Sequence, residues 1–74
     1  LDTWMMACGK CLGDSTLDDL TAEQSMHQHF ADANKRKAVF YGLLAERMKS
    51  AKNKTVRERL SERQIAHALN EAGL

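Results

Sequence analysis

Proline is absent from this 74-residue sequence. There are only four glycines, and aromatic side chains are few. Without proline, no residue forces a break inside a helix. With few glycines, few positions favour the left-handed backbone conformation. β-branched residues are also scarce and never alternate with polar residues as they do along a strand. Helix-favouring Ala, Leu, Glu, Lys, Arg and Gln are abundant instead. We therefore predict an all-α fold: one small helical domain over residues 1–74, built as a bundle of three to four short helices.

Long apolar runs are missing as well. The stretch Trp4-Met5-Met6-Ala7-Cys8 is too short to span a membrane and lacks the basic leader of a signal peptide. The two cysteines do not amount to the disulfide framework of a small secreted protein. We expect a soluble cytoplasmic protein that does not contact membranes. The first residue is Leu1 rather than Met, which is expected of a processed product, of an excised domain or of the remnant of an engineered chain.

The net charge of +1 conceals an uneven distribution of charge along the chain. Residues 1–34 carry a net charge of −5, and residues 35–63 carry +7. An acidic front half and a basic back half predict a surface that meets a polyanion. The alternative is that the two halves attract each other, within one chain or between two copies, and a homodimer is also favoured by the small size of the core.

The longest amphipathic segment without a breaker runs from Arg36 to Lys52, where we predict a central helix. Its apolar residues recur at helical spacing and form one stripe: Val39, Phe40, Leu43, Leu44, Met48 and Ala51. The other face is mostly basic. Gly42, inside this helix, costs about 1 kcal/mol relative to alanine, so we expect close packing against another helix at that point.

Turn and capping signals divide the rest of the chain. A short helix is expected within residues 1–12, closing near Gly9 or Gly13. The next helix begins at a cap on Thr16 or on Thr21 and runs to about Asp32. Its expected inner face consists of Ala22, Met26, Phe30 and Ala33.

After a break at residues 52–54, capping boxes begin at Thr55 and at Ser61, only six residues apart. This spacing predicts a short helical turn, a kink and a final helix. The final helix should end at Gly73, and its inner face should contain Ile65, Ala68, Leu69 and Ala72.

Residues 60–74 carry the most specific local pattern, Ser61-x-Arg63-x-Ile65-Ala66-x-x-Leu69-Asn70-x-x-Gly73. It resembles the first helix and turn of the helix-turn-helix in the DNA-binding region of serine recombinases. The resemblance implies that this helix braces a second helix, which reads the major groove. The sequence ends at Leu74, directly after the turn, and contains neither that recognition helix nor a recombinase catalytic segment.

A run of cations near the predicted kink suggests a second way to bind nucleic acid. Phosphates are held by charge and need no sequence code, and the residues predicted to contact them are Lys49, Lys52, Lys54, Arg57, Arg59 and Arg63. The leading hypothesis is a small regulatory protein that grips the DNA backbone. Tyr41 is the only exposed aromatic candidate for base stacking, so duplex DNA is favoured over single strands. The alternative is an ordinary solvated surface.

The competing hypothesis is a protein-binding regulator, an inhibitor or adaptor of the kind found in phages and plasmids. It would dock on a larger machine such as RNA polymerase or a nuclease. Docking would use the basic face or an acidic face, and the acidic residues expected there are Asp14, Asp18, Asp19 and Glu23.

Cys8-x-x-Cys11 followed by His27-x-His29 indicates a third hypothesis, a zinc-stabilised module. Two histidines two positions apart on a helix differ by about 200° around its axis, so only one of them faces a given ion. The predicted ligands are Cys8, Cys11 and His27. The alternative is that both thiols pack as small apolar groups near Trp4.

No catalytic function is expected. A cysteine nucleophile requires a base fixed beside the thiol and an oxyanion site, and nothing in the sequence indicates either. Cys-x-x-Cys redox chemistry usually sits on a βαβ scaffold, which this composition excludes. Apart from zinc, no cofactor is predicted.

Overall fold

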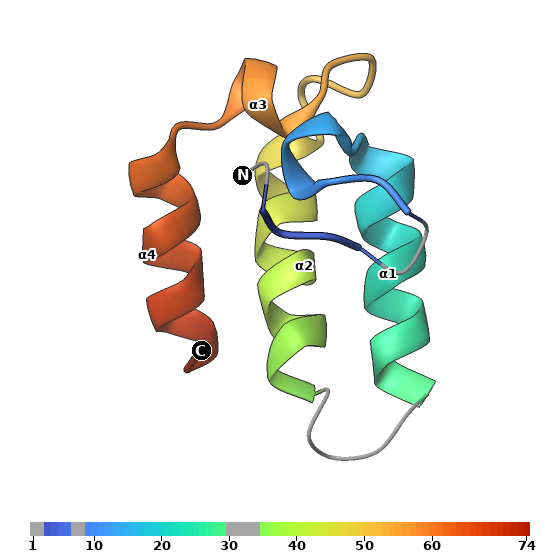
Figure 1. Ribbon diagram of the computed structural model, residues 1–74, viewed down its shortest axis with the longest axis vertical. Helices are drawn as coiled ribbons and strands as arrows, with labels where there is room; N and C mark the ends of the chain where they lie inside the picture. Colours follow the sequence, from blue (N-terminus) through green and yellow to red (C-terminus); the bar gives the residue numbers. More distant parts are fainter. Residues whose placement is uncertain (1–2, 7–8, 30–34) are drawn as a thin grey trace.

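The computed structural model describes residues 3–6, 9–29 and 35–74. Within these ranges it contains four α-helices and one 3-10 helix, and no strand: η1 (Leu12–Asp14), α1 (Leu17–His29), α2 (Lys35–Met48), α3 (Val56–Arg59) and α4 (Glu62–Ala72). Figure 1 shows α2 between α1 and α4 and antiparallel to both, with α3 across the end of the bundle. The predicted all-α fold is confirmed. No helix of the described residues is long and apolar enough to cross a membrane.

Helix α2 is buried on more than one side because α1 packs against one side and α4 against another. Its buried residues are Ala38, Phe40, Tyr41, Leu44, Ala45 and Met48, and most of them belong to the single core cluster. The predicted stripe is therefore only partly right. Phe40, Leu44 and Met48 are buried, but Val39 is 50% exposed, because the inward positions include Tyr41 and Ala45 instead.

The central helix is also shorter than predicted. It ends at Met48 instead of Lys52, and residues 49–54 form turns. The Ala51 N–H donates to the Met48 carbonyl and the Lys54 N–H to the Ala51 carbonyl. These bonds join residues three positions apart, as in turns, instead of four apart as in an α-helix. Close packing at Gly42 is confirmed, since a Cβ atom there would overlap the side-chain amide of Gln24 on α1.

Helix α1 starts from the first of the two predicted caps. The Asp19 carboxylate accepts hydrogen bonds from the backbone N–H and the hydroxyl of Thr16, while Thr21 lies inside the helix. The predicted inner face is wrong at Ala22, which is exposed, and Met26 is only partly buried. The buried residues are Leu20 and Glu23. Phe30, Ala33 and the predicted end at Asp32 lie outside the described residues.

The predicted helix near the N-terminus is wrong within the described positions 3–6 and 9–12. The chain instead pairs with itself, with an isolated antiparallel bridge between Met5 and Cys11. The Leu12 N–H donates to the Trp4 carbonyl at 2.7 Å. Gly9 has a φ of +93°, a conformation that glycine adopts without strain and that a helix does not allow. This N-terminal segment packs its Trp4 ring on Phe40, at 5.1 Å between centroids.

The C-terminal third follows the prediction closely. Capping boxes at Thr55 and Ser61 start α3 and α4, and the chain kinks between them at Leu60, whose backbone is extended. Ile65, Ala68 and Ala72 are buried on the inner face of α4, and Leu69 packs against the core. Gly73 caps the helix with a left-handed φ of +77°, as the sequence indicated.

The corrected register of α2 can be tested with two substitutions. Leu44→Ala should lower the free energy of unfolding by about 2–5 kcal/mol, because it opens a cavity where a fully buried side chain lay. Val39→Gln should change it by less than about 0.5 kcal/mol, because Val39 is half exposed. Urea unfolding followed by Trp4 fluorescence measures both. A large loss from Val39→Gln would show that this residue belongs to the core.

Candidate nucleic-acid interface

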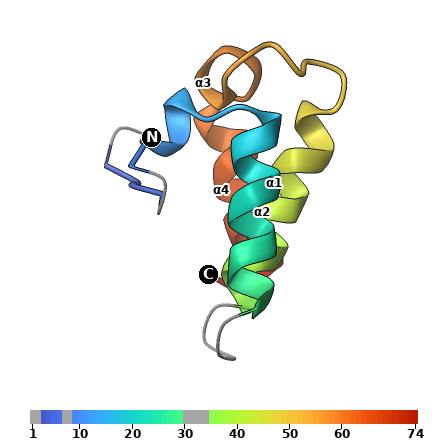
Figure 2. The same cartoon turned by 90° about the vertical axis from the view of Figure 1, so that its right-hand side faces the viewer.

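The six cations predicted to contact phosphate all lie toward one end of the bundle and are all exposed. They come from the turns after α2, from α3 and from the first turn of α4: Lys49, Lys52, Lys54, Arg57, Arg59 and Arg63. Figure 2 shows these turns and α3 covering the end at which α1 begins and α2 ends. We call this set the basic end. The structure therefore brings together residues that the sequence places on separate elements.

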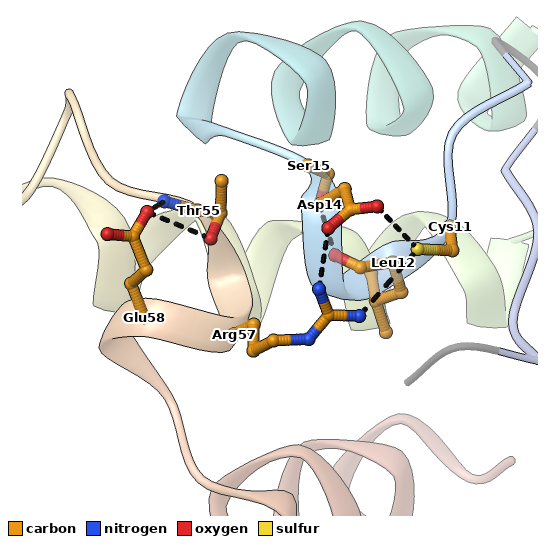
Figure 3. Close-up of polar contacts among 7 residues, drawn as sticks. All are labelled: Cys11, Leu12, Asp14, Ser15, Thr55, Arg57 and Glu58. Carbon is orange, nitrogen blue, oxygen red and sulfur yellow. Dashed lines mark hydrogen bonds and ion pairs between the residues drawn. The ribbon is translucent and has the colours of Figure 1, made fainter.

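Helix α3 is anchored by its contact with η1. The Val56 N–H donates to the Ser15 carbonyl at 2.8 Å, and the Val56 side chain is fully buried. Ser15 is itself buried, and its hydroxyl donates to the Leu12 carbonyl at 2.6 Å. Opposite this contact, the Glu58 carboxylate accepts from the Thr55 N–H at 3.1 Å. Figure 3 shows the Ser15–Leu12 and Thr55–Glu58 contacts. The contacts of Thr55 and Val56 both hold the N-terminal end of this one-turn helix, and its C-terminal end is closed by the Leu60 N–H, which donates to the Val56 carbonyl at 2.8 Å.

Arg57 reinforces the same contact from the surface (Figure 3). Its Nη1 atom lies 2.7 Å from Asp14 Oδ1, and the Cys11 thiol donates to the other oxygen of that carboxylate at 3.0 Å. A Cβ atom at Gly13 would lie 2.8 Å from Arg57 Nη2, so any side chain at position 13 would displace the guanidinium. Arg57 therefore positions α3 and is less available to phosphate than its neighbours.

The electrostatics of this region keep its carboxylates ionised. The hydrogen bond from the Cys11 thiol, together with the charge of Arg57, holds the pKa of Asp14 below its ordinary value of 3.8. The hydrogen bond from the Thr55 backbone lowers the pKa of Glu58 from 4.5, with a smaller contribution from the charge of Lys54. Two anions thus sit among the cations of the basic end.

Acidic neighbours reduce the number of cations that can meet an external anion. Lys49 pairs with Glu46 at 2.8 Å, and Arg57 pairs with Asp14. The remaining four cations are exposed and form no ion pair within the described part of the chain: Lys52, Lys54, Arg59 and Arg63. These four are the strongest candidates for phosphate contacts.

The acidic half does not form the continuous docking face that the sequence suggested. Asp14 is paired with Arg57, and Asp19 lies 3.0 Å from the Lys10 ammonium. Glu23, which we expected on this face, is only 4% exposed, because it points inward from α1. Asp18 alone of the four is exposed and forms no ion pair with another described residue.

Tyr41, the candidate for base stacking, is in fact buried. It is 2% exposed, and its hydroxyl accepts a hydrogen bond from Trp4 Nε1 at 2.8 Å. A ring in this position supports the core and offers no face to a nucleobase. Without this stacking candidate, contacts to a duplex backbone are favoured over binding to single strands.

The predicted zinc ligands have different neighbours in the structure. Cys11 contacts Asp14, and His27 lies against Glu23 and Tyr41. Cys8 lies outside the described residues. Within those residues no three His, Cys, Asp or Glu side chains are grouped so that they could hold a metal ion.

Comparison of the chain with protein-family models, with curated proteins and with solved structures gives no match. Function is therefore argued from the residues of this chain. Two structural partners escaped the sequence analysis. Asp14 was assigned to an acidic face, and nothing local indicates that it pairs with Arg57, 43 positions away. Nothing in the sequence around Ser15 indicates that its carbonyl accepts a hydrogen bond from Val56.

The pKa shifts predict how stability depends on pH. Since the folded state lowers the pKa of Asp14, the ionised carboxylate stabilises folding above pH 3.8, and this contribution is lost as the pH falls through the lowered pKa. Asp14→Asn should therefore lower the urea midpoint at neutral pH and have a smaller effect in acid. Urea titrations of both proteins at several pH values measure this. An equal difference at every pH would refute the ionic role of Asp14.

Proposed function

We propose that the protein is a small regulatory nucleic-acid-binding protein that contacts the backbone of duplex DNA with its basic end. The observation that carries the proposal is the group of four exposed cations, Lys52, Lys54, Arg59 and Arg63, on the turns and helices around α3. Exposed ammonium and guanidinium groups bind phosphate oxygens mainly through charge. The α3–η1 contact holds the helix that carries Arg59, and Lys52, Lys54 and Arg63 lie on the segments that flank this helix.

Two further features support this reading. Lys52 and Lys54 lie on the turns that follow the end of α2, and both side chains are exposed. Arg59 and Arg63 lie on either side of the kink at Leu60, on two helices with different directions. A set of cations spread in this way suits contacts to several phosphates and offers no element to read base edges. The expected binding is therefore indifferent to sequence.

The second candidate function is a protein-binding regulator that docks on a larger enzyme such as RNA polymerase. One observation favours it: a mostly apolar hollow lies between the N-terminal segment and α4, lined by Trp4, Leu12, Ile65, Ala66 and Leu69 together with Thr3 and Glu62. Hydrophobic and aromatic residues in a concave site are typical of partner recognition. A titration with DNA separates the two candidates. The hollow carries no cation, so a protein that uses only the hollow should not bind DNA.

The salt dependence of DNA binding tests the leading proposal. Four phosphate contacts should make the affinity for a random-sequence duplex fall about a hundredfold between about 50 mM and about 200 mM salt. The triple variant Lys52→Glu, Lys54→Glu, Arg59→Glu should reduce the slope of log affinity against log salt by about three. Fluorescence anisotropy of a labelled duplex measures both quantities.

The single variant Lys52→Glu should lower the slope by about one, and its matched control is Lys37→Glu, the same single change of charge at the opposite end of α2, which should leave the slope unchanged. Circular dichroism checks that each variant is folded. Absence of binding at low salt, or equal losses in Lys52→Glu and the control, would contradict the proposal. The apolar hollow beside α4 would then be the surface to examine with candidate partner proteins.

A further inference from the structure

A second hollow lies away from the basic end, where the N-terminal segment meets α1 and α2. It is lined by residues 3–5 of the N-terminal segment, by Glu23 and His27 of α1, and by Lys37 and Tyr41 of α2. Three separate parts of the chain therefore contribute to it. Its lining combines one acidic, one basic and several aromatic side chains, a mixture that the nucleic-acid proposal does not use.

The floor of the hollow contains a buried carboxylate whose hydrogen bonding is incomplete. Glu23 is 4% exposed, and its Oε2 atom has no hydrogen-bond partner among the described residues. His27 Nε2 lies 3.3 Å from this oxygen, close enough for an ion pair but without the geometry of a hydrogen bond. His27 Nδ1 is also buried and unpartnered. Such groups are costly to bury, so they indicate a site that receives a hydrogen-bond donor.

The walls of the hollow are aromatic and held in place. The His27 ring stacks on Tyr41, with centroids 5.4 Å apart and an interplanar angle of 14°. The Trp4 indole stands edge-on to Tyr41, with 6.5 Å between centroids, and donates its N–H to the Tyr41 hydroxyl. The partly exposed Trp4 ring beside a carboxylate favours a protonated amine with an apolar body, through cation–π contact and burial.

The charges on the hollow are of opposite sign and come from different helices. Glu23 is the one acidic residue of the lining and Lys37 is its one lysine, exposed on the first turn of α2. A simple cation would satisfy Glu23 but meet the charge of Lys37. A ligand with both an amine and an acidic group would satisfy both residues, since each charge then has a partner of opposite sign.

We propose that this hollow binds a small zwitterion, whose protonated amine meets Glu23 and whose carboxylate meets Lys37. The apolar body of the ligand lies against Trp4 and the exposed Met5 side chain. Amino acids are zwitterions of this kind, and they differ from one another in the distance between the ammonium group and the carboxylate. The proposal is independent of DNA binding, because none of the four candidate phosphate-binding residues lines the hollow.

Trp4 provides the readout, because it is the single tryptophan of the chain and lines the hollow. Titration of the protein with L-leucine, γ-aminobutyrate and ε-aminocaproate covers a range of charge separations. At least one of them should change the Trp4 emission with saturation. Its N-acetylated form, which lacks the protonated amine, and its methyl ester, which lacks the carboxylate, should each bind about tenfold or more weakly.

Glu23→Gln and Lys37→Gln should each weaken binding of the zwitterion by about tenfold or more, because each removes one charged contact. The matched control is Glu71→Gln on α4. Glu71 also pairs with a histidine one helical turn away, His67, at 3.0 Å, but that pair is exposed, so the control should leave binding unchanged. Circular dichroism and urea unfolding show whether each variant is folded.

Three results would overturn the proposal. The first is that none of the three zwitterions changes the Trp4 emission. The second is that folded Glu23→Gln binds as well as the unmodified protein. The third is that the methyl ester binds as tightly as the parent zwitterion and Lys37→Gln has no effect, which would reduce the site to one for simple amines.

Discussion

The contact between α3 and η1 determines how the C-terminal part of the chain is placed. The Val56 N–H bonds the Ser15 carbonyl, the Val56 side chain enters the core, and Arg57 meets Asp14 on the surface. Only Leu60 and Ser61 separate α3 from α4, so the direction in which α4 leaves is set by this short helix. A helix of one turn has little stability of its own. Its position therefore depends on these partners, and both the α2–α4 packing and the layout of the basic end depend on its position.

The same contact accounts for part of the uneven charge seen along the sequence. Arg57 from the basic half neutralises Asp14 from the acidic half, and Lys10 and Asp19 pair within the front half. What remains is a local group of exposed cations on a protein whose net charge is only +1. Long-range attraction to a polyanion is therefore weak. Binding must depend on close contacts between these cations and phosphate, because salt at about 0.1 M screens charges that lie more than about 10 Å apart.

The sequence predicted the fold best where local chemistry decides the structure. The capping boxes at Thr55 and Ser61 and the glycine cap at Gly73 involve neighbours in the chain, so their patterns are readable and were confirmed. The register of α2 depends on which helices flank it, and Val39 was consequently misplaced. Glu23 and Tyr41 were expected at the surface, because composition alone does not reveal that a polar side chain faces inward. The cations of the basic end were identified from their number, but their pairing with Glu46 and Asp14 required the fold.

Backbone amide NMR spectra recorded while a short duplex is added would show which residues of the protein contact DNA. The signals that move should be those of the basic end, above all Lys52, Lys54, Arg59 and Arg63, and these changes should fade as salt is raised. Signals of the hollow around Glu23 and His27 should stay in place. Changes concentrated at that hollow or along α4 beside Trp4, or no changes at all, would contradict the assignment of the basic end as a nucleic-acid interface.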